Sequence, residues 1–307
     1  MIYPNPPKPG DTILLVAPSS PLKPSETVTV ETITAGLQRM GFKVREGASV
    51  RTHTRRGYAA ADPQLRADDL NRGFADDSIA AIWPVRGGST AAQVVPLLDY
   101  EMIRRHPKPL MGFSDITALH MALHEKAGLA TFHAPNASIA INWDDADYSC
   151  RSLKKVLFME KSCEFENVPG RPIRVYRPGE ARGTLVGGNL SLVSEAVGTP
   201  YGLDTRGKVL FLEDIGENVY RLELMLTQIK HAGMFDRAVG VLLGDFTDCH
   251  NEYSDTYTAE ELLDDFFADF PIPVYRGLTA GHIDDNGALP LGTMCAMRDG
   301  RIFFEKV

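Results

Sequence analysis

The first 140 residues alternate short apolar runs with longer stretches that have helical periodicity. This alternation is typical of a mainly parallel sheet with helices packed on its faces. Gly41 ends the first helical stretch, and glycine is common at the C-terminal ends of helices. We therefore expect an α/β fold in this part of the chain. The expected strands are residues 12–17, 42–45, 79–85 and 109–112, and the expected helices are 30–40, 61–77 and 116–126.

The pattern changes over about 142–182, where charged residues and several prolines replace the periodic segments. This composition is typical of a connecting segment, so we expect an interdomain linker there. The resulting arrangement is an N-terminal α/β domain over 1–160 and a C-terminal β-rich domain over 180–307. In the second domain we expect strands at 183–186, 209–212, 239–243 and 302–304, helices at about 190–197 and 219–231, and a hairpin turn at Asp299-Gly300.

Composition excludes several classes of partner. The net charge is −8 over 307 residues, which argues against the broad basic face that duplex nucleic acid would need. The apolar run at 13–17 is far shorter than the ~18 residues that cross a bilayer, and the first ten residues lack the pattern of a signal peptide. The four cysteines form no CxxC pair. We expect a cytoplasmic protein with reduced thiols, no membrane association and no nucleic-acid partner.

Ser114 stands where the strand at 109–112 passes into a helix. With Gly112 two positions before it, this is the layout of a nucleophile elbow, in which a tight turn exposes the hydroxyl. Backbone N–H groups at the start of the helix are then available to a developing oxyanion. Serine is also a favoured helix N-cap, and the second glycine of the G-x-S-x-G pattern is missing. The local sequence leaves both roles open.

A serine nucleophile needs a general base, and four histidines are candidates. His282 lies in a loop with small neighbours after the apolar run at 273–275, a typical place for a catalytic side chain. His133 follows a short strand and is expected near the same sheet edge. His120 and His124 have the i, i+4 spacing of metal ligands, but no Glu lies between them, so we expect structural or solvent-facing side chains.

Glu213 ends an apolar strand, so its carboxylate should be partly desolvated. A buried carboxylate needs a partner, and an imidazole N–H would serve. The alternative is equally plausible: a solvated acidic cluster before the next helix, made of Glu213, Asp214 and Glu217. Sequence alone leaves this choice open.

Three further motifs carry weaker signals. Arg86-Gly87-Gly88 ends a buried strand, where paired glycines let a substrate approach the backbone N–H groups. Phosphate-binding glycine patterns are absent from the sequence. Gly187-Gly188-Asn189 opens a helix and is expected to serve packing. Cys249-His250 matches no metal-ligand spacing, so we expect no metal site.

Seven motifs occur in the order and at the spacings of one family, and on them the chain resembles the LD-carboxypeptidases. These muramoyltetrapeptide carboxypeptidases form a serine peptidase family that also contains the microcin-immunity peptidases. The resemblance runs from about residue 10 to the C-terminus. The motifs are Val-Ala-Pro-Ser-Ser at 16–20, Arg-Gly-Gly at 86–88, Gly-Phe-Ser-Asp-Ile-Thr at 112–117, Gly-Gly-Asn-Leu at 187–190, Gly-Thr-Pro at 198–200, Leu-Glu-Asp at 212–214 and Gly-His at 281–282.

The resemblance implies a catalytic triad of Ser114 as nucleophile, His282 as base and Glu213 as acid. It also implies that the serine lies in the N-terminal domain and the other two in the C-terminal domain, usually in a homodimer. The implied reaction removes terminal D-alanine from the L-centre of a diamino acid, turning murein tetrapeptide into tripeptide during cytoplasmic recycling. Neither a metal nor another cofactor is required. For the oxyanion donors we expect the backbone N–H groups of Gly88 and Asp115.

A carboxypeptidase must also bind the terminal carboxylate of its substrate, and the fork of an arginine matches two carboxylate oxygens. Arg86 is the nearest candidate by motif, with Gly87 beside it as a substrate contact, while Arg182 and Arg221 remain open. Where the family commonly has an aromatic residue and another glycine after Arg-Gly-Gly, this chain has Ser89-Thr90. The substrate subsites are therefore not predicted by the resemblance.

Two alternatives to the murein hydrolase remain. One is an amidase of the microcin-immunity type, which cleaves a carboxamide in a peptide-nucleotide and would need an aromatic residue in the C-terminal domain to stack on the base. The other is a non-enzymatic small-molecule binding protein that holds an anion at the helix N-terminus near Asp115.

Overall fold

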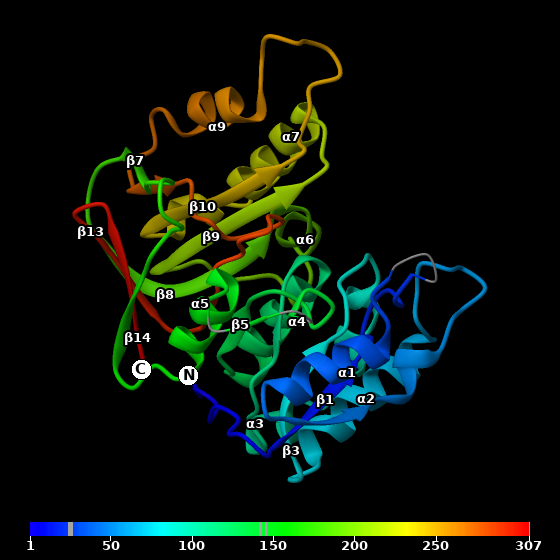
Figure 1. The fold of residues 1–307 in the computed structure, drawn as a ribbon. Coiled ribbons are helices and arrows are strands. Elements are labelled where there is room, and N and C mark those ends of the chain that lie inside the picture. The colour runs from blue at the N-terminus through cyan, green and yellow to red at the C-terminus, as the bar shows by residue number, and fades with distance from the viewer. Residues whose placement is uncertain (24–26, 141–142, 145, 307) are drawn as a thin grey trace.

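The structure is a computed structural model that describes residues 1–23, 27–140, 143–144 and 146–306. Residue 142, where the expected linker begins, and residue 307 lie outside these ranges. The chain folds into two halves, with the blue-to-cyan N-terminal half beside the yellow and orange elements of the C-terminal half (Figure 1). Within the described residues, every helix is too short or too polar to cross a membrane.

The N-terminal half is built on parallel strands. β1 pairs in parallel with β2 and β3, a parallel bridge between Ile82 and Leu110 continues the sheet toward β4, and β4 pairs in parallel with β5. This arrangement confirms the predicted, mainly parallel N-terminal sheet. The strands are β1 (Thr12–Val16), β2 (Lys43–Glu46), β3 (Ile79–Pro84), β4 (Met111–Gly112) and β5 (Thr131–His133).

Helices cover this sheet because their apolar positions recur on one face. In α1 the side chains of Val30, Ile33 and Leu37 are buried, and Thr29 caps the helix through reciprocal hydrogen bonds with Thr32. The helical elements of this half are α1 (Val30–Arg39), η1 (Ala48–Arg51), α2 (Pro63–Ala75), η2 (Ala91–Gln93), η3 (Val95–Leu97), α3 (Tyr100–Arg105), η4 (Ser114–Ile116), α4 (Thr117–Ala122) and η5 (Leu123–Ala127).

The C-terminal half contains an eight-stranded mixed sheet with the order β6-β14-β13-β8-β9-β10-β11-β7. Its central strands β8 to β11 run parallel, with helices in the connections, so this β-rich half also contains strand–helix units. The strands are β8 (Ala181–Asn189), β9 (Lys208–Ile215), β10 (Gly240–Thr247), β11 (Val274–Arg276), β13 (Met294–Arg298) and β14 (Arg301–Glu305). The helices are α6 (Leu190–Glu195), α7 (Val219–His231), α8 (Met234–Arg237) and α9 (Ala259–Phe267).

The stretch expected as a linker carries structure of its own. It contains α5 (Tyr148–Leu157), β6 (Ser162–Phe165) and β7 (Arg174–Arg177). β6 pairs with β14 at one edge of the large sheet, and β7 pairs with β11 at the other edge. Sequence composition alone does not reveal these pairings, because edge strands are short and carry many charged side chains.

One segment ties the two halves together. β12 (Leu289–Leu291) belongs to the C-terminal half but pairs antiparallel with β5 of the N-terminal half. Directly after β12, the Gly292 N–H donates to the Leu185 carbonyl at 2.7 Å, and the Leu185 N–H donates to the Thr293 carbonyl at 2.8 Å. The segment 289–293 therefore bonds to β5 and to β8, and fixes one sheet against the other.

The contact made by β12 predicts a stability effect. Leu289 is fully buried in a core that contains residues from both halves, so Leu289→Ala should lower the free energy of unfolding by about 2–5 kcal/mol. Leu224→Ala is the control, because 61% of that side chain is exposed, and it should change stability by less than about 0.5 kcal/mol. Urea denaturation measures both. Equal effects of the two changes would contradict the proposed role of this segment.

Candidate active site

Ser114 occupies a strained turn between β4 and α4. Its φ is 64°, a conformation that few non-glycine residues adopt. Such a residue stores about 1–3 kcal/mol of strain, and a strained strand-to-helix turn is the geometry of a nucleophile elbow. The N-cap positions of η4 and α4 are Phe113 and Ile116, and neither helix has a side-chain cap bond. Ser114 is therefore not an N-cap, and the structure favours the elbow.

The two glycines of the Arg-Gly-Gly motif pack closely, Gly87 against this turn and Gly88 against Ser19 and Ser20. A Cβ atom added to Gly87 would lie 3.1 Å from Ser114 Oγ and 3.4 Å from the Asp115 amide nitrogen. Gly88 has a φ of 148°, and a Cβ there would lie 2.1 Å from Ser20 Oγ. Only glycine fits at position 88. The Gly88 N–H donates to no acceptor in the part of the chain that the structure describes, so it is available to a ligand.

The side chain of Asp115 fixes the loop that carries Gly88. Its Oδ2 accepts hydrogen bonds from the Thr90 and Ala91 amides, both at 2.8 Å, and from the Ser19 hydroxyl. Arg66 reaches the same loop and donates to the Thr90 carbonyl at 3.0 Å. Both charged side chains are almost fully buried. Asp115 thus holds the loop with its carboxylate, while its backbone amide nitrogen faces Gly87.

His282 and Glu213 form a buried pair, although 69 positions separate them in the sequence. His282 Nδ1 lies 2.7 Å from Glu213 Oε2, and the side chains are 12% and 0% exposed. An ionised carboxylate only accepts, so Nδ1 carries the proton that it donates and Nε2 is left for proton transfer. The Phe113 ring packs on the imidazole, with 4.6 Å between the ring centroids.

The surroundings of Glu213 explain why its partner matters. Burial raises the pKa of this carboxyl, and the hydrogen bond and charge of His282 are the main effects that oppose the rise. A Cβ added to Gly281 would lie 2.7 Å from Glu213 Oε2, so the backbone next to His282 presses against the carboxylate. The sequence left open whether Glu213 orients a base. In the structure its buried carboxylate is paired with His282, as that role requires.

Asn189 is a site neighbour that the sequence interpretation missed. Its Nδ2 lies 3.4 Å from Glu213 Oε1 and donates to Asp214 Oδ1 at 2.9 Å. The backbone N–H of Asn189 donates to Thr117 Oγ1 at 3.1 Å, and this bond joins β8 to the helix that follows Ser114. We expected the Gly187-Gly188-Asn189 motif to serve packing. The available signal was its position, since an asparagine at the end of a strand and the start of a helix is a typical N-cap.

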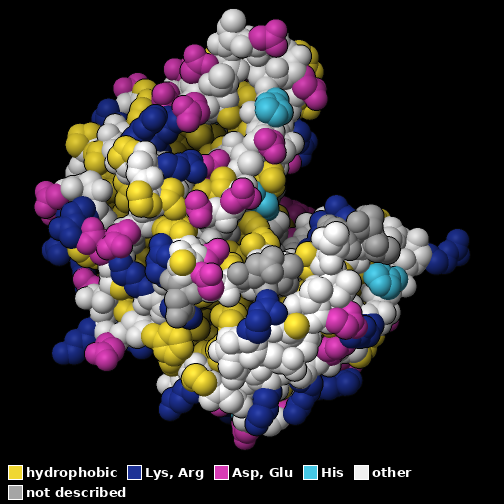
Figure 2. All heavy atoms as spheres, in the orientation of Figure 1, with side chains coloured by type: hydrophobic (Ala, Val, Ile, Leu, Met, Phe, Trp, Pro, Cys, Tyr) yellow, Lys and Arg dark blue, Asp and Glu magenta, His cyan; other side chains and the backbone are white. Residues whose placement is uncertain are grey.

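Ser114 and His282 line the same cavity, which has a volume of about 470 Å³. This volume lies in the range of small-molecule sites. No hydrogen bond joins the Ser114 hydroxyl to His282 among the described residues, and catalytic bonds of this kind often tighten only when substrate binds. Figure 2 shows the molecular surface hollowed between the two halves. The lining residues are Val28, Arg86, Gly87, Gly88, Phe113, Ser114, Asn136, Ser138, Ile139 and His282.

The other candidate residues lie elsewhere. Arg182 forms an ion pair with Glu305, and Arg221 forms one with Glu217, and neither arginine lines the cavity. Of the three arginines considered for the substrate carboxylate, the structure therefore brings only Arg86 to the site. Glu217, with its charge directed to Arg221, is not the partner of His282.

The other three candidate histidines, His120, His124 and His133, are buried. His120 bonds to the Gly112 carbonyl at 2.9 Å, and His124 lies 2.9 Å from Lys208 Nζ, so both are structural rather than solvent-facing. His133 is fully buried between the Phe113 and Phe211 rings, and burial lowers its pKa well below the usual value. His133 does not line the cavity. In the described ranges, no group of three or more His, Cys, Asp or Glu side chains could hold a metal ion.

Comparison with known proteins agrees with the architecture. Residues 13–134 match the family model of the LD-carboxypeptidase N-terminal domain, and residues 182–297 match that of the C-terminal domain. The chain is 37% identical over 289 residues to a Bacillus subtilis protein named "Probable murein peptide carboxypeptidase", covering 94% of this chain and 89% of the relative.

Two solved structures have similar folds. The muramoyltetrapeptide carboxypeptidase from Oxalobacter formigenes is 25% identical with a TM-score of 0.80, and the match covers 95% of this chain and 97% of that chain. The wild-type microcin C7 self-immunity protein is 24% identical with a TM-score of 0.87, covering 100% and 99%. The second likeness concerns the fold alone. With both family models matched in order along one chain, this protein belongs to the LD-carboxypeptidase family.

Proposed function

We propose that this protein is a serine-type carboxypeptidase that releases terminal D-alanine from murein tetrapeptide. The observation that carries the proposal is the 2.7 Å contact between His282 Nδ1 and Glu213 Oε2, in a cavity wall that also contains Ser114. A base oriented by a buried acid, in the same cavity as a half-buried, strained serine, is the arrangement that acyl transfer requires. The name of the Bacillus subtilis relative supports a murein peptide as the substrate.

The proposed reaction follows from the positions of these groups. His282 Nε2 takes the proton of the Ser114 hydroxyl, and the serine oxygen attacks the carbonyl carbon of the amide bond. Glu213 stabilises the imidazolium that forms, and the amides of Gly88 and Asp115 bind the oxyanion. The imidazolium then protonates the leaving D-alanine nitrogen. Water, activated by the same imidazole, hydrolyses the acyl-enzyme.

Arg86 is proposed to bind the terminal carboxylate of the substrate, with the Gly87 backbone beside it. Both residues line the cavity with Ser114. A guanidinium near the nucleophile restricts cleavage to the last peptide bond, because the carboxylate must lie within one residue of the attacked carbonyl. We further propose a cytoplasmic homodimer with domains over 1–160 and 180–307, in keeping with the family resemblance.

The microcin-type amidase remains the second candidate, and the fold likeness to the microcin C7 self-immunity protein is the observation that favours it. That activity would need an aromatic residue of the C-terminal half to stack on a nucleobase. Among the described residues that line the cavity, no Phe, Tyr or Trp comes from that half. This lining supports the murein peptide over the peptide-nucleotide.

The direct test offers two substrates to the purified protein: murein tetrapeptide, and a peptide amide linked to a nucleotide. We expect mass spectrometry to detect D-alanine and tripeptide from the first and no cleavage of the second. Ser114→Ala should lower the rate roughly 10⁴-fold or more, with substrate still bound. Ser162→Ala, on an exposed edge strand, is the matched control. Full activity of the Ser114 variant would refute a serine mechanism, and binding without turnover by the wild type would favour the non-enzymatic alternative.

Removing the charge of Glu213 should slow the reaction less than removing the nucleophile. For Glu213→Gln we expect a loss about 10²-fold smaller than for Ser114→Ala, because the acid orients and stabilises the base. Glu217→Gln is the control and should retain activity. The reverse result for the two glutamates would show that the acid is misassigned.

The role of Arg86 predicts a loss of substrate discrimination. Arg86→Gln should lower kcat/KM roughly 10- to 100-fold, which corresponds to the loss of a hydrogen bond to a charged group. The same variant should then treat the free-acid substrate and its C-terminally amidated form alike. Arg182→Gln and Arg221→Gln should behave as wild type, because their side chains pair outside the cavity. A KM effect confined to Arg182 or Arg221 would transfer the role to that residue.

A further inference from the structure

His282 is carried by a loop, residues 277–288, that has no helix or strand of its own. Two of its internal hydrogen bonds join its first half to its second half. The Gly287 amide donates to the Thr279 carbonyl at 2.6 Å, and the Gly281 amide donates to Asn286 Oδ1 at 2.9 Å. The second bond is the closer one to the base, because Gly281 directly precedes His282.

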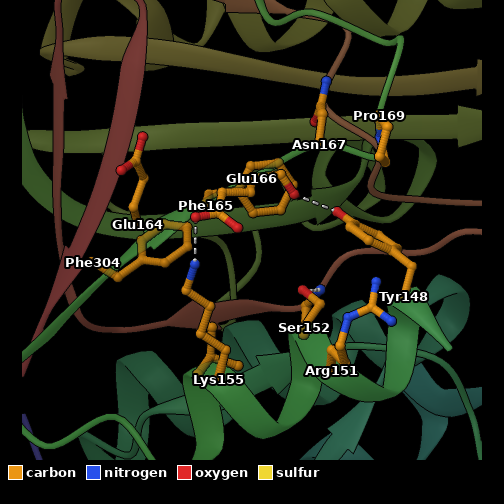
Figure 3. Close-up of a pocket in the computed structure, with 12 residues that line it drawn as sticks. Tyr148, Arg151, Ser152, Lys155, Glu164, Phe165, Glu166, Asn167, Pro169 and Phe304 are labelled. Atoms are coloured by element: carbon orange, nitrogen blue, oxygen red, sulfur yellow. Dashed lines mark hydrogen bonds and ion pairs between the residues drawn. The ribbon is translucent and has the colours of Figure 1, made fainter. Parts of the chain in front are cut away.

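Helix α5 holds this loop from outside through three hydroxyl groups. Ser149 Oγ accepts from the Asn286 amide at 2.9 Å, and Ser152 Oγ accepts from the Ala288 amide at 2.9 Å. Tyr148 OH lies 2.8 Å from Thr279 Oγ1. Figure 3 shows Tyr148 and Ser152 on α5 at the wall of a cavity of about 300 Å³, across from Asn167.

We propose that Ser149 and Asn286 are positioning residues for the base His282, an inference that rests on the proposed function. Ser149 fixes the backbone of Asn286, and the Asn286 side chain fixes the amide of Gly281. The side chains form a continuous path from α5 to the residue before the imidazole. Both are buried, at 2% and 1% exposure, so water does not readily replace these bonds.

The backbone at Gly281 has little room to move. The space where its Cβ would stand is only 2.7 Å from Glu213 Oε2, and His282 Nδ1 lies 2.7 Å from the same oxygen. A backbone shift of a few tenths of an ångström at Gly281 therefore alters the distance and angle of the His282–Glu213 bond. Hydrogen bonds weaken steeply with poor geometry, so the path from α5 controls how well the acid orients the base.

Ser149→Ala tests this role, because it removes one hydroxyl that does not line the catalytic cavity. We expect kcat to fall roughly 10- to 100-fold while KM changes little, since a displaced catalytic group slows the chemical step. The second readout is the NMR signal of the His282 Nδ1 proton, which should shift or broaden. Ser194→Ala is the matched control. Ser194 lies in α6, is 3% exposed and donates to Gln228 Oε1 of α7 at 2.8 Å, away from the loop.

The outcomes separate the inference from the proposed function. A normal kcat and an unchanged proton signal in Ser149→Ala overturn the positioning role, and so do equal losses in Ser149→Ala and Ser194→Ala. If Ser149→Ala does not fold, Asn286→Ala breaks the same path at its other member and is judged by the same two readouts. If the wild type releases no D-alanine, the proposed function fails, and the proton signal still decides whether Ser149 and Asn286 set the His282–Glu213 bond.

Discussion

The hydrogen-bonded pair of Glu213 and His282 is the constraint on which the site depends. A carboxylate with no exposed surface is unfavourable by several kcal/mol unless it is paired, and His282 supplies that partner at 2.7 Å. The pair in turn dictates the residues around it. A Cβ at Gly281 would lie 2.7 Å from Glu213 Oε2, and a Cβ at Gly244 would lie 3.1 Å from Glu213 Cβ and 2.3 Å from the Ala280 carbonyl oxygen, so a side chain would clash at both positions. The Gly281-His282 motif is thus a steric consequence of placing a base against a buried acid.

The pair can serve the proposed reaction only if Ser114, the proposed nucleophile, is held at a fixed place relative to it, and two independent connections contribute to this. β12 joins β5 in one sheet and, through Gly292, bonds to β8 in the other. Closer to the site, Thr117 Oγ1 accepts a hydrogen bond from the backbone N–H of Asn189, and the side chain of Asn189 lies against the Glu213 carboxylate. Asn189 therefore links the helix that follows Ser114 to the carboxylate of Glu213. This explains how residues from two differently built halves line one cavity.

Features set by local sequence could be predicted, and features set by long-range contact could not. The parallel N-terminal sheet followed from periodicity, and Ser114 at a strand-to-helix turn followed from its neighbours. The same neighbours could not distinguish an elbow from an N-cap, because that depends on a φ of 64°. The partnership of Glu213 and His282 came from family resemblance, since no local pattern joins residues 69 positions apart. The serines of α5 gave no signal, because their partners lie more than 130 positions away.

The two sides of the site are supported by separate buried polar networks, and this separation has a mechanistic consequence. Asp115 and Arg66 hold the glycine loop that carries Gly88, which we propose as an oxyanion donor, whereas α5 holds the loop that carries His282. Neither network shares a residue with the other in the bonds described. A change in one should therefore alter either oxyanion binding or proton transfer, but not both, provided that β12 keeps the sheets in register. Electrostatic preorganisation of this kind needs rigidity on each side of the cavity, and the side chains that would provide it, Asp115, Arg66, Ser149 and Asn286, are not among the residues that line the cavity.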